Sequence, residues 1–164
     1  MKRVLCIWFP NWPIQRRCVK QPLDRALVLH APVSGKTRVI ACCRNARRRG
    51  VAPGMLLAEA QSLWPIAAEN RVCFEAHDSS ADRQALRELT VWCQQFSPSA
   101  AVDEAASPDC LLLDATGCDW YFGSETAFAE KVVTRLHQRG YWVAAVLADT
   151  VGAAWGLAHY GPLP

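Results

Sequence analysis

The chain has 164 residues, of which 51% are apolar and 20% are charged, and its formal net charge is +3. This length and composition predict one compact domain or a small pair of domains with a proper hydrophobic core. No segment approaches the ~18 uninterrupted apolar residues of a membrane-spanning helix, and the apolar run near the N-terminus is too short for a signal peptide. We therefore expect a soluble, cytoplasmic protein that does not bind membranes.

The chain contains eight cysteines and four histidines. No two cysteines have C-x-x-C spacing and several lie inside apolar runs, so we expect small buried side chains in a reducing compartment. The histidines, His30, His77, His137 and His159, are isolated in the sequence. A metal site built from cysteine or histidine is therefore not expected.

The first element in the chain is an unbroken apolar run at residues 4–9, which predicts a buried central strand. Pro10 cannot donate to a strand ladder, so regular pairing should stop by Phe9. No carboxylate lies on this strand. A short polar turn or helix is expected at 14–20, followed by two strands, 26–30 and 37–42, that form a hairpin around Gly35.

A basic segment follows the hairpin. Arg44, Arg47, Arg48 and Arg49 crowd into six positions of a predicted helix that Gly50 ends in the left-handed conformation. This local cluster is more informative than the net charge. By composition alone it is an ordinary solvated helix face, and the alternative is a contact with nucleic-acid phosphate. A second short helix is expected at residues 55–63.

The second half of the chain predicts a long amphipathic helix at 79–95, with apolar residues on one face. Strands at 99–102 and 111–115, a helix at 124–139, a strand at 141–148 and a last helix at 150–159 follow. Without residues 11–77, the order is strand, helix, strand, strand, helix, strand, which is the ferredoxin-like split βαβ order. The predicted fold class is therefore α+β, with a small inserted subdomain. Nucleic-acid polymerase palms use this sheet, but so do many unrelated proteins.

Two stretches resemble a known family. Residues 39–65, VIACCRNARRRGVAPGMLLAEAQSLWP, resemble the fingers motif of the Y-family translesion DNA polymerases. The matching positions are Ala46, Arg47, Gly50, Val51, Gly54, Met55, Glu59 and Ala60. VLCIWFPNWPIQR at 4–16 and LLLDATGCDWYFGSE at 111–125 resemble the ImuB-like branch, whose members have lost polymerase chemistry. The resemblance implies a palm-like domain at 1–10 and 78–164, a fingers-like insertion at 11–77, and a thumb and C-terminal DNA-gripping domain that are absent from this chain.

Carried over residue by residue, the resemblance places Trp8 at the family's first metal-binding aspartate, and an indole cannot bind Mg²⁺. Pro10 falls where many active members have a second acidic residue. Arg44 stands where they have the tyrosine that checks the incoming sugar. Arg47 matches the arginine that contacts the triphosphate, a role that suits a planar fork of donors. Val151 falls at about the position of a later lysine.

The family's second acidic motif fits in two registers. Matching by identity selects Asp103 and Glu104, whereas counting back from the strand at 111–115 selects Asp109 and Cys110. Both registers stay open at this point. Two-metal phosphoryl transfer needs carboxylates that bridge the two ions, and the opening strand has lost one. We therefore expect no catalytic residue, no bound metal and no cofactor, with Mg²⁺ required only if the protein is an active polymerase.

The favoured hypothesis is a non-catalytic, ImuB-like bacterial protein of the SOS response, acting in damage-induced translesion synthesis and mutagenic DNA repair as a scaffold for an error-prone polymerase. The resemblance implies weak binding to DNA backbone phosphates, with Arg47 on phosphate and Arg44, Arg48 and Arg49 on DNA. It also implies a replicative-type error-prone polymerase, a RecA-like accessory protein and the sliding clamp as partners, through C-terminal parts that are missing.

Two alternatives are kept. The first is an active but divergent translesion polymerase that uses Asp103, Glu104 or Asp109 with one metal ion for nucleotidyl transfer. The second is a ferredoxin-like protein-interaction domain that has no nucleic-acid role.

Overall fold

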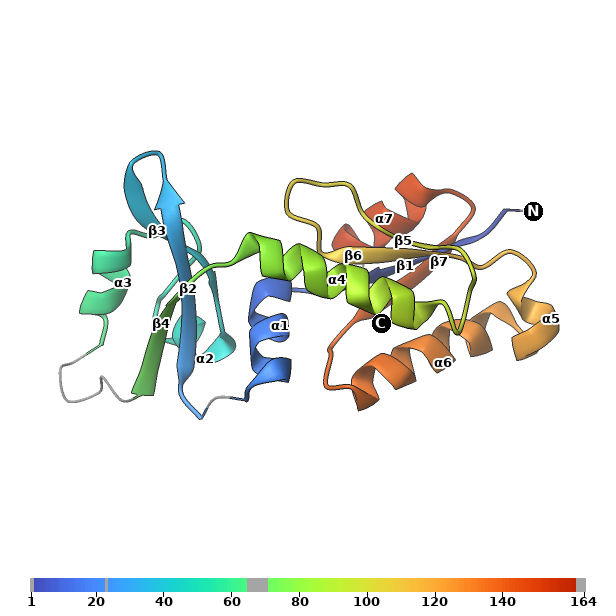
Figure 1. Cartoon of the computed structure of the whole chain (residues 1–164), viewed down its shortest axis with the longest axis horizontal. Coiled ribbons are helices and arrows are strands. Elements are labelled where there is room, and N and C mark those ends of the chain that lie inside the picture. Colours follow the sequence, from blue (N-terminus) through green and yellow to red (C-terminus); the bar gives the residue numbers. More distant parts are fainter. Residues whose placement is uncertain (1, 23, 65–70, 162–164) are drawn as a thin grey trace. The chain divides into compact units, whose positions relative to one another are not determined.

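The computed structural model describes residues 2–22, 24–64 and 71–161, and Figure 1 shows the arrangement of the helices and strands. The fold is mixed α+β with two sheets, one in each of two compact units. The first unit consists of residues 1–10 and 80–164, and the second of residues 11–79. Among the described residues, no helix has both the length and the apolar character needed to cross a membrane.

A four-stranded antiparallel sheet forms the centre of the first unit, with the strand order β5-β6-β1-β7. The strands are β1 (Val4–Trp8), β5 (Ala100–Val102), β6 (Cys110–Asp114) and β7 (Ala144–Ala148). The apolar run lies at the centre of the sheet, and its first four residues are buried, as predicted. The strand ends at Trp8, immediately before the two residues that precede the second unit. The end of β1 is therefore also where the chain leaves the sheet.

The helices of this unit are α4 (Ser79–Cys93), α5 (Cys118–Phe122), α6 (Glu125–Gln138) and α7 (Val151–Tyr160). The chain order β1, α4, β5, β6, α6, β7 is the one expected from the sequence. The short helix α5, between β6 and α6, was not predicted. Ser124 and Thr150 cap α6 and α7, and their side-chain oxygens accept hydrogen bonds from the backbone N–H groups of Ala127 and Ala153.

The two faces of β1 are buried differently because successive side chains point to opposite sides of a sheet. Cys6 packs with Cys110 of β6 and with Ala154 and Ala158 of α7 in one apolar cluster. Figure 1 shows α7 and α6 on opposite sides of this sheet. The helix α7 therefore covers the face that carries Cys6, Cys110 and Trp8.

The last strand of the sheet is shorter than predicted. We expected a strand at 141–148, but β7 begins at Ala144, which pairs with Trp8 at the end of β1. Tyr141 instead donates its backbone N–H to the Leu136 carbonyl at the end of α6. The ladder between β1 and β7 ends at the pair Trp8 and Ala144, because β1 itself ends at Trp8.

The second unit contains a three-stranded sheet with the order β3-β2-β4. Its elements are α1 (Trp12–Lys20), β2 (Ala26–Val33), β3 (Lys36–Cys42), α2 (Arg44–Arg48), α3 (Leu57–Ser62) and β4 (Val72–Ala76). The predicted hairpin is present, and Ser34 and Gly35 form its two-residue turn with φ values of 49° and 77°. The strand β4, which pairs in parallel with β2, was not predicted. Pro65, the last residue of the fingers-like motif, lies outside the described residues.

A bidentate ion pair links α1 to β4 in this unit. Arg17 donates from Nε to Glu75 Oε2 at 2.7 Å and from Nη2 to Oε1 at 2.8 Å. These hydrogen bonds lower the pKa of the Glu75 carboxyl from its usual value of 4.5. The pair therefore stabilises the fold only while Glu75 is ionised.

We expect Glu75→Gln to lower the free energy of unfolding by about 1 kcal/mol at neutral pH, since the pair is partly exposed. Because the folded-state pKa is depressed, the contribution is complete above pH 4.5 and is lost as the pH falls through the lowered pKa. Urea unfolding of the wild type and the variant at pH 7 and at pH 3 measures the contribution of this ion pair to the free energy of unfolding. The difference between wild type and variant should shrink at pH 3, whereas Glu59→Gln, at an exposed helical carboxylate, should show no such pattern.

Candidate functional site

Trp8, which the resemblance places at the family's metal-binding aspartate, lies at the end of β1 opposite Cys110 of β6. Its indole Nε1 donates a hydrogen bond of 2.9 Å to Asp109 Oδ2. A backbone hydrogen bond links the same two segments, since the Phe9 N–H donates to the Asp109 carbonyl at 2.8 Å. The side chain at the position that the resemblance assigns to the metal-binding aspartate is therefore hydrogen-bonded to the Asp109 carboxylate.

His159, in the last turn of α7, completes the arrangement. Its Nε2 lies 3.0 Å from Asp109 Oδ1, and its Nδ1 lies 2.8 Å from the Trp155 carbonyl oxygen. Its ring stacks on Trp155 with centroids 4.2 Å apart, and it lies 5.0 Å from the Trp8 ring. Both of these oxygens only accept, so each contact is a hydrogen bond when the ring nitrogen that faces it carries a proton. We call Trp8, Asp109, Cys110, Trp155 and His159 the Trp8 cluster.

Cys110, at the buried side of the Trp8 cluster, remains a thiol. The pKa of Cys110 is raised well above its usual range, first by a side-chain hydrogen bond with Cys6 and then by burial. A thiol is a poor metal ligand because metals bind the thiolate. The atoms that Asp109, Cys110 and His159 could offer to a metal lie within 4.8 Å of one another, but hydrogen bonds already occupy this group.

The Trp8 cluster does not fit the two Mg²⁺ ions of an active polymerase of the resembled family. Mg²⁺ needs oxygen ligands in octahedral geometry. In the Trp8 cluster, Trp8 presents an indole and Cys110 presents a thiol in place of oxygen ligands. Each oxygen of Asp109 already has a hydrogen-bond partner, Trp8 for Oδ2 and His159 for Oδ1. His159 is isolated in the sequence, but α7 brings it to Asp109.

The two candidate acidic pairs lie in different places. Pairing of β1 with β6 brings Asp109 and Cys110 beside Trp8. Asp103 lies on the other side of Cys110, and its backbone N–H donates to the Cys110 carbonyl at 3.3 Å. The residues Asp103 and Glu104 line a separate pocket of about 400 Å³ together with Arg83, Arg87, Thr90, Val91 and Val102.

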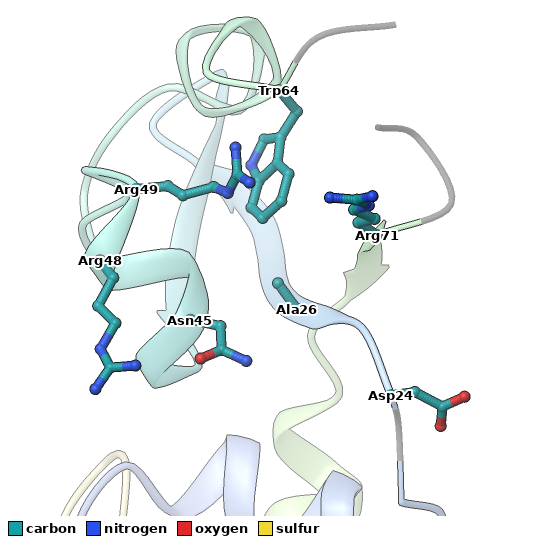
Figure 2. Close-up of a pocket in the computed structure, with 7 residues that line it drawn as sticks. All are labelled: Asp24, Ala26, Asn45, Arg48, Arg49, Trp64 and Arg71. Atoms are coloured by element: carbon teal, nitrogen blue, oxygen red, sulfur yellow. The ribbon is translucent and has the colours of Figure 1, made fainter. Parts of the chain in front are cut away.

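The arginines of the basic segment are exposed and diverge around α2. The buried Ala46 anchors the helix in the core of the second unit. Arg47 forms a side-chain hydrogen bond with Cys42, which opposes the rise that burial causes in the pKa of that thiol. The side chains of Arg48 and Arg49 instead line a pocket that also contains Trp64 and Arg71, shown in Figure 2. Sequence reasoning did not select Arg71, which stands alone in the sequence.

The fold is that of a Y-family polymerase relative, and the comparisons agree. The chain belongs to the impB/mucB/samB family, whose family model matches residues 7–158.

Two curated relatives are called Protein ImuB and come from Caulobacter vibrioides strains NA1000 / CB15N and ATCC 19089 / CIP 103742 / CB 15. Each is 43% identical to this chain over 115 residues. That region is 69% of this chain and 23% of the relative, so the chain spans about a quarter of the curated proteins it matches. The resemblance to the ImuB-like branch is thereby confirmed.

Solved structures show the same fold. The post-insertion binary complex of Dbh DNA polymerase matches with a TM-score of 0.74 and 19% identity, over 96% of this chain and 45% of that one. DinB from Sulfolobus solfataricus matches with a TM-score of 0.70 and 18% identity, with the same coverage. This chain therefore spans less than half of each polymerase.

Proposed function

We propose that this chain is a non-catalytic, ImuB-like member of the family that acts as a DNA-associated scaffold in mutagenic translesion synthesis. In this proposal residues 1–10 and 78–164 are the palm-like domain and residues 11–77 the fingers-like insertion. One observation carries it: at the end of β1, hydrogen bonds from Trp8 and His159 to Asp109 stand where an active enzyme needs metal-binding carboxylates. In this proposal the palm-like domain keeps the sheet of an active polymerase but lacks the carboxylates that bind metal ions for nucleotidyl transfer.

The proposal makes Asp109 and Cys110 the counterparts of the family's acidic pair, because they lie beside Trp8. The chemistry would then occur on a partner polymerase. A RecA-like accessory protein and the sliding clamp are the other partners we propose, bound through segments outside this chain. The exposed arginines of α2 supply the contact with DNA phosphates.

Primer extension tests the absence of catalysis. The purified chain is incubated with primer-template DNA, four nucleotides and either Mg²⁺ or Mn²⁺, and we expect no extension. DNA binding measured by fluorescence anisotropy should also be unchanged by metal and by the matching nucleotide. Templated extension that Asp109→Ala abolishes would contradict the proposal, because a contaminating polymerase would be unaffected by that substitution.

For DNA association, we expect Arg44→Ala to weaken binding about 3-fold to 10-fold at low salt and to reduce the slope of log K against log salt by about 1. Arg44 is exposed on α2 and is outside the pocket with Trp64. Arg135→Ala removes an equally exposed arginine from α6 and serves as the matched control. Equal losses in the two variants would show a response to net charge alone and would argue against a contact at α2.

A further inference from the structure

The second unit contains a pocket of about 480 Å³ that lies outside the Trp8 cluster. It is lined by Asp24, Ala26, Asn45, Arg48, Arg49, Trp64 and Arg71. These residues come from separate segments of the unit, and Figure 2 shows the Trp64 indole between the side chains of Arg49 and Arg71. Arg47, the position that the resemblance assigns to the triphosphate, is not among them.

The buried polar atom in this pocket has no partner. Trp64 is only 9% exposed, and its indole Nε1 is buried without a hydrogen-bond partner. A buried N–H donor without an acceptor costs stability, and such groups in native proteins usually have an explanation. An acceptor supplied by a ligand is the explanation that the surrounding charges favour.

The pocket is rich in donors and poor in acceptors. The Arg49 guanidinium carbon lies 4.5 Å from the centroid of the Trp64 ring, a cation–π contact that holds Arg49 beside the indole. Arg48 and Arg71 also line the pocket, and Asp24 contributes the carboxylate among the lining residues. In Figure 2 the Arg71 guanidinium lies beside Trp64, whereas that of Arg48 points away from the indole. In Figure 2 the Asp24 carboxylate points away from Trp64. The ligand that fits is therefore an anion with several acceptor oxygens.

A phosphate group matches this set of donors. Guanidinium groups bind phosphate oxygens through paired N–H donors, and the indole N–H can donate to a further oxygen. The volume of the pocket leaves room for the sugar to which a phosphate is attached. A phosphate of a nucleic-acid strand and the phosphate of a free nucleotide share this chemistry.

We propose that the pocket formed by Arg48, Arg49, Trp64 and Arg71 binds a phosphate group of a single-stranded DNA segment, with the Trp64 N–H as one of its donors. The choice of DNA as the source of the phosphate rests on the proposed function. The pocket then fixes the second unit on a DNA strand at a place separate from Arg47.

Two variants separate this role from simple packing. Trp64→Phe removes the N–H and keeps an aromatic ring beside Arg49, and Arg71→Ala removes one guanidinium from the opposite side. We expect each to weaken binding of labelled single-stranded DNA about 5-fold to 10-fold. Arg71→Ala should also reduce the salt slope by about 0.7. If the N–H is merely an unsatisfied donor, Trp64→Phe leaves DNA affinity unchanged.

The indole N–H signal of Trp64 gives a direct readout in ¹⁵N-correlated spectra of the whole chain, and its absence from Trp64→Phe assigns it. Titrations use single-stranded DNA, a nucleoside monophosphate and inorganic phosphate. The proposal expects a shift of this signal that saturates with DNA at the lowest concentration and is lost in Arg71→Ala. Arg135→Ala is the control and should retain the shift.

The possible results distinguish failure of the proposed phosphate pocket from failure of the proposed scaffold function. If both pocket variants bind DNA as tightly as the wild type, and the Trp64 N–H signal does not shift with DNA, the proposal that the pocket binds phosphate is wrong. The proposed scaffold function is not affected by that result. Absence of DNA binding by the wild type overturns the DNA-associated function and the DNA source. In that case a Trp64 shift with nucleoside monophosphate supports the phosphate assignment, and no shift with any of the three ligands overturns it.

Discussion

Replacement of Asp109 by alanine is expected to lower the free energy of unfolding by about 2–3 kcal/mol, because it removes the acceptor for two buried or partly buried donors. Trp8 Nε1 and His159 Nε2 each donate to a different oxygen of this carboxylate. The His159 side chain is only 10% exposed, whereas that of Asp109 is 35% exposed. The larger part of the loss therefore comes from leaving the more buried His159 ring without its partner, and the exposure of Asp109 keeps the loss from being larger.

Urea unfolding of three variants measures this effect. Asp109→Asn keeps one carbonyl acceptor and should lose less stability than Asp109→Ala. Asp103→Ala removes a neighbouring carboxylate that lines the pocket with Arg83 and Arg87, and it should cost less than about 1 kcal/mol. Equal destabilisation by Asp109→Ala and Asp103→Ala would mean that the bonds from Trp8 and His159 contribute nothing specific.

The sequence predicted those parts of the fold that depend on local signals. The apolar run before Pro10 predicted β1, and the helices expected at 124–139 and 150–159 are α6 and α7. The features of the fold that the sequence did not predict depend on pairing between distant segments. The strand β4 has only five residues and pairs in parallel with β2, about 45 positions earlier in the chain. The start of β7 is set by where β1 ends.

The candidate site was predicted only in part for the same reason. Trp8 and Asp109 could be selected because a family motif marks their positions. His159 could not, because 50 positions separate it from Asp109 and no spacing rule relates a helix at the end of the chain to a turn before β6. The proposed choice of Asp109 over Asp103 also rests on the pairing of β1 with β6. Local sequence patterns identify candidate residues, but the pairing of strands and the packing of helices determine which of these residues lie in contact.

The substitution Trp8→Asp is expected to give no polymerase activity and to lower the free energy of unfolding by about 3–4 kcal/mol. Trp8 packs against the apolar cluster that contains Cys6 and Cys110, and its ring lies 5.0 Å from that of His159. The substitution removes these contacts and places a second carboxylate beside Asp109. Trp8→Phe keeps an aromatic ring, although a smaller one, and removes the N–H, so it should cost less than Trp8→Asp, about 1–2 kcal/mol.

The expected inactivity of Trp8→Asp follows from the other positions of the Trp8 cluster. The restored carboxylate would face the Cys110 thiol, whose pKa is raised, and an Asp109 whose second oxygen still accepts from His159. Two metal ions need bridging carboxylates with free oxygens, so one substitution restores one ligand of a site that has lost several. Primer extension and urea unfolding of Trp8→Asp and Trp8→Phe test this together. Templated synthesis by Trp8→Asp with Mg²⁺ would show that the missing aspartate alone prevents catalysis, and that the hydrogen bonds of His159 and the thiol of Cys110 are compatible with a working metal site.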